Sequence, residues 1–350
     1  MTSDVNTEPT LRDLADEAGV SVAAVSKVLN NRKGVSTETR ERVLRIAREL
    51  GYRGRGGRLA EEKLTSAAIV TLDRYVTNDS FYGEIIHSIV REGQAAGINV
   101  SVSVTGSPEG AAHPDTLFPA GPPQAVFLVG IDEPAVVDAV HALGRPTVIV
   151  NGMDRHMRLP SVSPDYHLGG WRATRYLLDL GHRNIVHVTH PYRESFRRRV
   201  DGFRNAIEEA GITFDPQSHL LDLGSPEAIS IRAREIVTNY LNSVDERPTA
   251  FFCVNDIVAL GTIQALQANG LSVPEDVSVM GFDGLSVGEH ASPSLTSMQI
   301  DRQEVGRAAI RQLQDRVVFP DRPAQRVSIG VDLLARKSTG PLVGAGAINN

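Results

Sequence analysis

Apolar positions recur with two different periods along this chain of 350 residues. Before residue 52 they return every three to four positions, which is typical of amphipathic helices. After residue 66, short apolar runs alternate with helical stretches, and these runs are too short and too rich in β-branched residues for helices. Alternation of this kind predicts parallel sheets covered by helices. The expected strands are AAIVTLD, INVSVSV, AVFLVG, PTVIVNG, NIVHVTH, AFFCVND, VSVMGFD and LTSMQI, and the expected helices cover residues 81–96, 133–143, 166–180, 195–210, 226–242, 256–269 and 302–318.

Three short helices are predicted before residue 52. Thr10 and Asp13 have the spacing of a capping box, and Gly19 is a C-terminal stop, so the first helix is expected to end near Ala18. Ser21 is placed to cap a second helix directly afterwards. Two short helices around a tight turn predict a helix-turn-helix, and a third helix follows from Ser36 to Leu50. The expected buried positions are Leu11, Leu14, Ala15 and Ala18, then Val25, Val28 and Leu29, then Val43, Ile46, Ala47 and Leu50.

Charge is distributed unevenly along the chain. Residues 21–60 hold ten Lys or Arg and three acidic residues, a net charge of +7. The whole chain carries −6, so the remaining residues carry −13. A basic N-terminal module on an acidic body indicates a module that contacts phosphates, and the overall pI of about 5.9 hides it.

The N-terminal motif and the later blocks together resemble one protein family. TLRDLADEAGVSVAAVSKVLN and VSTETRERVLRIARELGY are similar to the DNA-binding headpiece of the LacI/GalR family of bacterial transcription regulators. The blocks GGWRATRYLLDLGHRNIVHV, RRRVDGFRNAIEEAGI, AFFCVNDIVALG and VPEDVSVMGFDG follow in the family's order. The resemblance implies a small all-α helix-turn-helix headpiece and an α/β core of two periplasmic-binding-protein-like lobes with parallel sheets.

From these patterns we expect five segments. Residues 1–9 form a flexible N-terminus, 10–52 the DNA-binding domain, and 53–65 a hinge or linker. Residues 66–337 form the effector-binding and dimerisation core, and 338–350, small and polar without periodicity, form a disordered tail. Within the core, one lobe is expected at 66–160 plus 297–325 and the other at 161–296 plus 326–337.

The expected function is a repressor acting as a homodimer, or alternatively a tetramer, on roughly palindromic operator DNA. A dimer follows because one short recognition helix reads too few bases alone. Lys27 or a neighbouring arginine is expected to prefer guanine, while Val22 and Ala23 meet thymine methyl groups. The residues expected at the DNA backbone are Thr10, Ser21, Ser26, Asn30, Arg32 and Lys33.

The segment RGRGGRLAEEKLTS departs from the family pattern of a hinge helix that wedges a leucine into the minor groove. Aligned without gaps, Glu61 takes the wedge position, whereas a shift of about three residues supplies Leu59. The glycines in this segment raise the entropy cost of ordering a helix. The expected hinge residues are Arg55, Arg58 and Leu59.

Polar groups directly after apolar runs are expected to bind a small effector, because ligands of open α/β folds lie beyond the carboxyl ends of strands. Carboxylates, an amide and an arginine suit a polyhydroxylated ligand such as a sugar. The resemblance supports an effector contact at Arg199, Asn255 and Asp283 in particular. They fall on the motifs RRVDGF, VND and GFD, whose Arg, Asn and Asp contact the effector in relatives. The full expected set is Asp73, Phe81, Tyr82, Asp165, Arg199, Asn255, Asp256 and Asp283. Asp73 and Asp256 have the alternative roles of turn residue and helix cap, and Phe81 and Tyr82 that of lobe packing.

Enzyme signals are weak in this sequence. Residues 284–288 match G-x-S-x-G, but Asp283 separates the strand from the first glycine and the only later histidine is His290. The three histidines His182, His187 and His190 have no carboxylate or cysteine that completes a metal-ligand spacing. We therefore expect no catalytic residue, no metal and no cofactor.

The remaining expectations concern compartment and partners. MTSDVNTEPT is polar, no apolar run has signal-peptide or membrane-span length, and a cytoplasmic protein without a membrane partner is expected. The single cysteine, Cys253, is expected in the core. The segment from Gly106 to Gln124, with five prolines, is expected as a loop or one short turn. Two alternatives stay open: a regulator responding to a nucleobase or nucleoside, and a solute-binding protein without DNA function.

Overall fold

The structure is a computed structural model that describes residues 9–29, 34–50, 52, 64–77, 80–107, 110, 112–118, 121–190, 192–224 and 229–342. The chain divides into two compact units, residues 1–64 and residues 65–350. The expected hinge residues Arg55, Arg58 and Leu59 lie outside the described residues, as do Asn30, Arg32 and Lys33.

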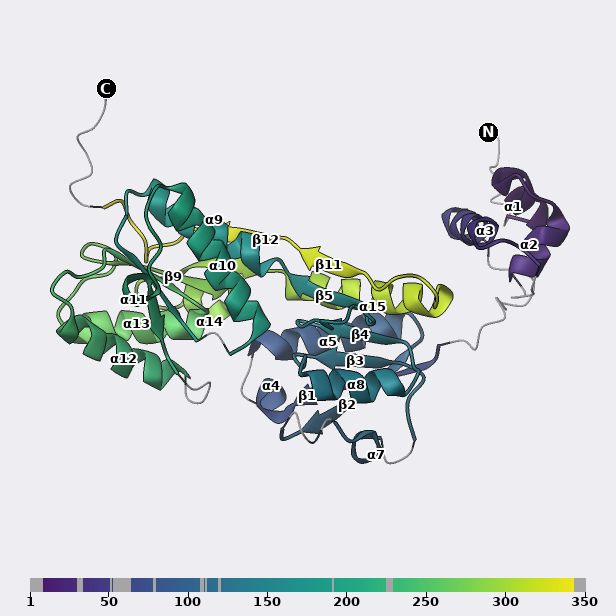
Figure 1. Ribbon diagram of the computed structural model, residues 1–350, viewed down its shortest axis with the longest axis horizontal. Coiled ribbons are helices and arrows are strands. Elements are labelled where there is room, and N and C mark those ends of the chain that lie inside the picture. The colour runs from purple at the N-terminus through teal and green to yellow at the C-terminus, as the bar shows by residue number, and fades with distance from the viewer. Residues whose placement is uncertain are drawn as a thin grey trace, which may run out of the picture. The chain divides into compact units, whose positions relative to one another are not determined.

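The first unit contains α1 (Leu11–Ala18), α2 (Val22–Leu29) and α3 (Thr37–Glu49) (Figure 1). The capping box is present: Thr10 Oγ1 accepts from Asp13 N, and Asp13 Oδ2 accepts from Thr10 N at 2.6 Å. Gly19 has φ 64°, a left-handed conformation that suits glycine, and Ser21 Oγ accepts from Ala24 N at 3.1 Å. The expected helix-turn-helix is therefore confirmed.

The small core of this unit is largely as expected. Leu14, Val25 and Val43 have no exposed surface. The expectation for Leu50 was wrong, because this side chain lies past the end of α3 and is 41% exposed. Leu44, which we did not expect, is buried instead.

The second unit is built on two six-stranded sheets (Figure 1). The first sheet has the order β11-β5-β4-β3-β1-β2 and its pairs are all parallel. The second has the order β12-β10-β9-β8-β6-β7, with only the β10–β12 pair antiparallel. The predicted α/β core with parallel sheets is confirmed.

Each sheet and its helices form one lobe. The first lobe (residues 65–164 and 302–329) contains β1 (Ser66–Leu72), α4 (Asp73–Thr77), α5 (Ser80–Ala95), β2 (Asn99–Thr105), α7 (Pro114–Leu117), β3 (Val126–Val129), α8 (Pro134–Ala142), β4 (Thr147–Val150), β5 (Ser161–Pro164), α15 (Arg302–Val318) and β11 (Arg326–Ile329). The second lobe (residues 165–300 and 331–342) contains α9 (Tyr166–Asp179), β6 (Ile185–Thr189), α10 (Glu194–Glu209), α11 (Pro216–His219), β7 (Leu220–Asp222), α12 (Ile229–Ser243), β8 (Ala250–Cys253), α13 (Asp256–Ala268), β9 (Ser278–Asp283), α14 (Ser286–Glu289), β10 (Thr296–Ile300) and β12 (Val331–Leu334).

These lobes correct the boundaries expected within the core. Strands β5 and β11 belong to the first sheet, and β10 belongs to the second, so the chain crosses between lobes after β5, β10 and β11. The error arose because β5 and β11 are strands of four residues, and β11 lies at a sheet edge with half-exposed faces. Such strands have a weak apolar pattern, and their pairing is set by partners far away in the sequence.

The last described residues also correct an expectation. Ser338 is fully buried, donates from Oγ to Val279 O at 2.6 Å and accepts from Thr296 N at 2.8 Å. Leu342 N donates to Leu180 O at 2.9 Å. Residues 338–342 are therefore packed on the second lobe rather than disordered, because their hydroxyl and backbone groups complete hydrogen bonds beside the sheet. Residues 343–350 lie outside the described range.

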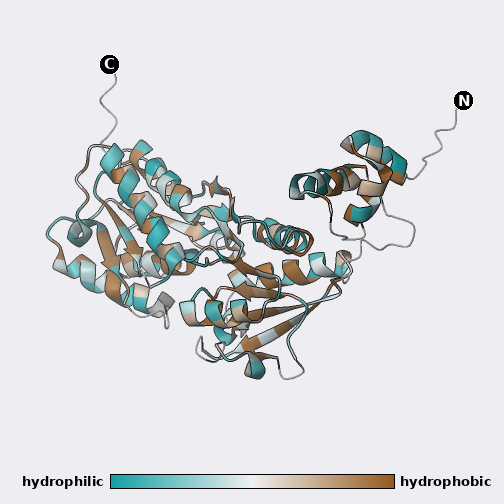
Figure 2. Cartoon of the chain, turned by 45° about the vertical axis from the view of Figure 1, so that its right-hand side comes forward, coloured by the Kyte–Doolittle hydropathy of each residue, from teal (hydrophilic) through white to brown (hydrophobic). Residues whose placement is uncertain are grey.

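Apolar residues concentrate in the strands, as the brown segments of Figure 2 show, and β3 and β4 are fully buried. Cys253 lies in this interior, where Sγ donates to Thr262 Oγ1 at 3.4 Å and burial raises the pKa of the thiol to about 12. Among the described helices, none is both long and apolar enough to cross a membrane.

Candidate functional site

The exposed face of α2 is the first candidate site. Val25, Val28 and Leu29 are buried against the other helices, and this leaves the opposite face exposed. Val22 is 43% exposed, and Ala23 and Lys27 are exposed beside it. The structure therefore brings together all three residues expected to read bases.

Of the residues expected to contact the DNA backbone, the structure describes Thr10, Ser21 and Ser26. Thr10 and Ser21 lie at the starts of α1 and α2, where each hydroxyl oxygen accepts a backbone N–H. The Ser21 hydroxyl keeps its own hydrogen for a phosphate oxygen, whereas the Thr10 hydroxyl donates its hydrogen to Asp13 Oδ2 at 2.8 Å. Ser26 is half-buried on α2.

The second candidate site lies between the lobes, where Arg193 from the second lobe reaches into the first. This residue is the N-cap of α10 and is almost fully buried. Its Nη1 donates to the hydroxyls of Tyr75 at 2.8 Å and Tyr82 at 2.5 Å. Its Nη2 donates to the carbonyls of Gly130 at 3.1 Å and Asn151 at 3.2 Å. All four acceptors belong to the first lobe, so this single side chain bridges the interlobe cleft.

The aromatic rings strengthen this bridge. The guanidinium carbon of Arg193 lies 5.4 Å from the ring centroid of Tyr75 and 5.5 Å from that of Tyr82. Cations at such distances are attracted to ring faces. Asn151 adds a second link, since Tyr166 of the second lobe donates its hydroxyl to Asn151 Oδ1 at 2.5 Å. Sequence reasoning missed Arg193, Asn151 and Tyr166.

Arg199 and Asp283 meet at the floor of the cleft in the second lobe. Arg199 is buried, and its Nη2 donates to Asp283 Oδ1 at 3.3 Å while Nη1 donates to Val254 O. The guanidinium carbon lies 4.1 Å from the ring centroid of Phe282 and 4.4 Å from that of Tyr166. Asp283 has φ 107°, a strained conformation for a non-glycine residue. Its carbonyl accepts from Arg302 Nη1 at 2.6 Å, so contacts on both sides hold the strained residue in place.

Five buried polar atoms of the second lobe have no hydrogen-bond partner in the described part of the chain. They are His187 Nε2, Thr189 Oγ1, both ring nitrogens of His190, and Arg199 Nε. The ring of His190 stacks on Tyr192 at 4.7 Å and meets Phe196 edge-on, and Arg199 lies 5.1 Å from the same Phe196 ring. Burial lowers the pKa of His190 to about 4, which keeps the imidazole neutral. Unpartnered buried polar atoms are unusual and often complete their bonds with water or a ligand.

The other expected effector residues are scattered. Asp256 is fully buried, with Oδ1 accepting from the Ser297 hydroxyl at 2.5 Å and Oδ2 from Leu285 N at 2.6 Å, and burial raises its pKa to about 6. Its carboxylate is committed inside the second lobe. Asn255 caps α13, since Oδ1 accepts from Val258 N at 2.8 Å. Asp73 is exposed at the start of α4, and Phe81 packs edge-on against Tyr82 with ring centroids 5.1 Å apart.

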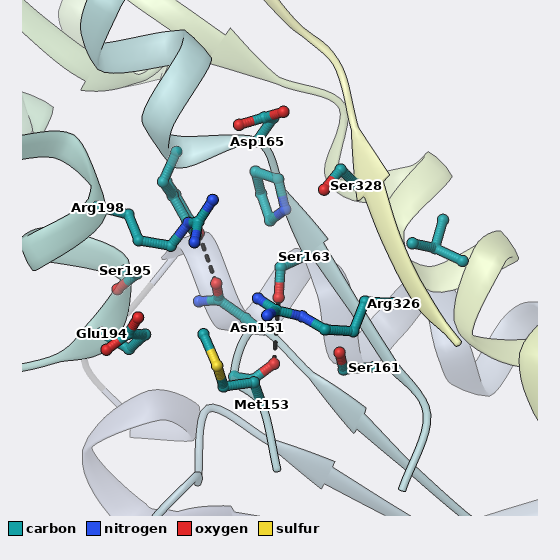
Figure 3. A pocket seen from close by; sticks show the side chains of 14 residues that line it. Asn151, Met153, Ser161, Ser163, Asp165, Glu194, Ser195, Arg198, Arg326 and Ser328 are labelled. Carbon is teal, nitrogen blue, oxygen red and sulfur yellow. Dashed lines mark hydrogen bonds between the residues drawn. The ribbon is translucent and has the colours of Figure 1, made fainter. Parts of the chain in front are cut away.

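A hollow of about 440 Å³ adjoins the cleft (Figure 3). Asn151, the strands β5 and β11, and the starts of α9 and α10 line it. Asp165, the N-cap of α9, is the expected effector residue that it contains. Arg198 of the second lobe and Arg326 of the first point into it from opposite sides in Figure 3. These two arginines were not expected from the sequence.

Comparison with known proteins gives the same two parts. A family described as bacterial regulatory proteins, lacI family, matches residues 10–54, and a periplasmic binding protein-like domain matches residues 174–339. The ribose operon repressor of Haemophilus influenzae is 30% identical over 89% of this chain and 93% of its own length. The transcriptional repressor PurR of Haemophilus influenzae is 29% identical over 94% of this chain and 98% of its own length.

A solved structure agrees with these relatives. The transcriptional regulator CelR, in complex with cellobiose, superposes with a TM-score of 0.69 at 26% identity, covering 94% of this chain and 99% of that one. All three proteins are transcriptional regulators, which supports a role other than an enzyme.

Proposed function

Because the chain belongs to the LacI family of bacterial regulatory proteins and is a DNA-binding transcriptional repressor with an effector-binding domain, we propose that a small carbohydrate bound between its lobes controls its operator affinity. The observation that carries the proposal is the set of unpartnered buried polar atoms at Thr189, His190 and Arg199. A polyhydroxylated ligand supplies both donors and acceptors to such groups.

At the DNA, Lys27 contacts guanine, and Val22 and Ala23 contact thymine methyl groups. Thr10, Ser21 and Ser26 contact the backbone of the duplex. Two copies bind a roughly palindromic operator, since each α2 reads one half-site and the half-sites lie about one helical turn apart. Asn30, Arg32, Lys33, Arg55, Arg58 and Leu59 remain proposed contacts in this scheme.

At the effector, Arg199 and Asp283 hold ligand hydroxyls, Asn255 adds an amide, and Tyr82 offers a ring face. Asp256 is left out because both of its carboxylate oxygens are already bonded within the second lobe. A ligand that favours one degree of lobe closure shifts the dimer between half-site spacings that fit or misfit the operator. The related ribose operon repressor and the CelR–cellobiose complex support a carbohydrate.

A nucleobase or nucleoside is the second candidate. The rings of Tyr75 and Tyr82 lie 4.1 Å apart at the first-lobe wall, and aromatic faces of this kind stack on bases. The relative PurR carries a purine-related name and supports this alternative.

The experiment is an operator-binding titration of the full chain with and without sugars, nucleosides and nucleobases, repeated with Asp283→Ala. We expect one compound to change the operator affinity of the wild-type protein by about fivefold or more, the usual size of allosteric coupling. The variant is expected to bind operator normally and to lose this response, because Asp283 is in the cleft and not in the headpiece. A normal response in the variant would remove Asp283 from the site. A chain beginning at Thr65 that binds DNA as tightly as the full chain would overturn the role of α2.

A further inference from the structure

Two arginines in the hollow of Figure 3 have no acidic partner. Arg198 lies on α10 in the second lobe, and Arg326 begins β11 in the first lobe. Among the residues that the structure describes, neither guanidinium forms a hydrogen bond or an ion pair. Arg197, next to Arg198 in the sequence, differs in this respect, since its Nη2 lies 3.0 Å from Glu194 Oε2.

The carboxylates that line the hollow are already engaged. Glu194 is shared between Arg197 at 3.0 Å and Arg155 at 3.8 Å. Asp165 accepts from Leu168 N at 3.0 Å as the N-cap of α9, where the positive end of the helix also favours its charge. The positive charges of Arg198 and Arg326 are therefore not compensated by these acids.

Hydroxyl groups surround the two arginines. Ser161, Ser195 and Ser328 line the hollow, and in the described residues their hydroxyls have no protein partner. Ser163 donates to Gly152 O at 3.3 Å. Two guanidinium forks with several hydroxyl donors are the groups that bind phosphate oxygens in proteins, since guanidinium donates two parallel bonds to such an anion.

The hollow borders the cleft, because two residues belong to both. Asn151 and Tyr166 line the hollow, while the carbonyl of Asn151 accepts from Arg193 and the ring of Tyr166 packs on Arg199. The hydrogen bond from Tyr166 to Asn151 lies between the two sites, so a ligand that occupies both requires these two side chains to separate.

We propose that this hollow binds the phosphate group of a phosphorylated sugar, with Arg198 and Arg326 contributed by the two lobes. The proposal rests on the effector cleft proposed above and narrows its ligand from a carbohydrate to an anionic one. Because the two arginines repel each other when the hollow is empty, a phosphate between them favours the closed arrangement of the lobes.

The test uses the full chain and calorimetric titration with ribose against ribose 5-phosphate and glucose against glucose 6-phosphate. Thermal unfolding is measured in parallel in inorganic phosphate and in chloride at equal ionic strength. We expect inorganic phosphate to raise the unfolding temperature, and at least one phosphorylated sugar to bind about tenfold or more tightly than its neutral partner. Both effects should be lost in the Arg198→Gln/Arg326→Gln variant. Arg326→Gln alone, at the exposed edge of a sheet, should weaken both without affecting folding.

The matched control is Arg204→Gln. Arg204 lies on α10 like Arg198, but it is exposed and pairs with Glu208 at 2.8 Å. This variant loses one positive charge and should keep the full response to phosphate. Equal stabilisation by phosphate in the double variant would place the anion elsewhere, for example on the basic headpiece, and would overturn the proposal.

The result separates this proposal from the function on which it rests. If a neutral sugar binds as tightly as its phosphate ester and changes operator affinity, the phosphate site is wrong and the regulator stands. If phosphate and phosphorylated sugars bind through Arg198 and Arg326 without changing operator affinity, the phosphate site stands and the proposed control of DNA binding is wrong. If inorganic phosphate raises the unfolding temperature no more than chloride does, and no phosphorylated sugar binds more tightly than its neutral partner, the phosphate site is wrong.

Discussion

Two residues of the cleft, Asp283 and His190, are held in a conformation or an environment that costs free energy. Asp283 keeps a strained backbone, which costs roughly 1–3 kcal/mol, because Arg199 and Arg302 hold its carboxylate and carbonyl. His190 keeps both ring nitrogens buried without a partner in the described part of the chain. Strain and unfilled hydrogen-bonding capacity within one cleft are typical of a binding site rather than of a packing core.

The pH dependence of folding should report on His190. An unfolded imidazole has a pKa near 6.5, whereas burial lowers that of His190 to about 4. Between these values the unfolded chain binds a proton that the folded chain does not, so the free energy of unfolding falls as the pH drops from about 6.5 to about 4. We predict that His190→Phe reduces this fall by at most about 3 kcal/mol.

At pH 8 the same variant should be more stable than the wild type by about 1–3 kcal/mol, because no buried nitrogen is left unbonded. Denaturant titrations at several pH values measure both effects. Some pH dependence remains, since burial lowers the pKa of His187 to about 3. His87→Gln, an exposed position on α5, is the control. An unchanged profile in His190→Phe would mean that His190 is hydrated in solution.

At the scale of elements, the local patterns were sufficient where neighbouring residues decide the conformation. Helix α1 begins at the capping box of Thr10 and Asp13 and ends at the left-handed Gly19, as predicted, because these interactions span four residues or fewer. Asp256 shows the opposite case. A carboxylate directly after a strand can cap a helix or face a ligand, and the local sequence does not distinguish these two roles. Asp256 has neither role, because its oxygens accept hydrogen bonds from Leu285 and Ser297, which are distant in sequence.

The exposed face of α2 gives a prediction about base reading. Lys27→Ala should weaken binding to the preferred duplex by about 1–3 kcal/mol and relax the preference at one base pair, because a lysine at a guanine edge discriminates bases. The preferred duplex is first selected from random sequences with the wild-type protein, and single-base variants are then titrated. Arg32→Ala, at a proposed phosphate contact, should instead weaken all duplexes equally and reduce the salt dependence. The same loss on every duplex for both variants would contradict the assignment of Lys27.

At the scale of the whole molecule, the sequence patterns did not predict which distant segments pair with one another. The eight apolar runs became strands, but the lobe boundaries failed at β5, β10 and β11, whose sheet depends on partners far along the chain. Arg193 was missed for the same reason. Nothing in YRESFRRR distinguishes it from its neighbours, and its partners Tyr75 and Tyr82 lie in the other lobe.

The Arg193 bridge predicts that the lobes separate more readily without it. Arg193→Ala removes four hydrogen bonds and two ring contacts between the lobes. Hydrogen exchange at residues 73–77 and 130–132 should therefore speed up about tenfold or more, whereas the centre of β8 should keep its protection. Arg197→Ala, which removes pairs to Glu194 within α10, is the matched control. Unaltered exchange at both cleft segments would show that other contacts hold the lobes together.

The state of Cys253 makes the motion of the lobes accessible to spectroscopy. It is the single cysteine of the chain, it has no exposed surface, and burial keeps its thiol protonated. Maleimide dyes and nitroxide spin labels react with exposed thiolates, so the native protein should remain unlabelled. One surface cysteine introduced into each lobe would then carry a donor–acceptor pair without background and without replacing any native residue. The chain is in this sense already suited to watching single molecules open and close as effector is added.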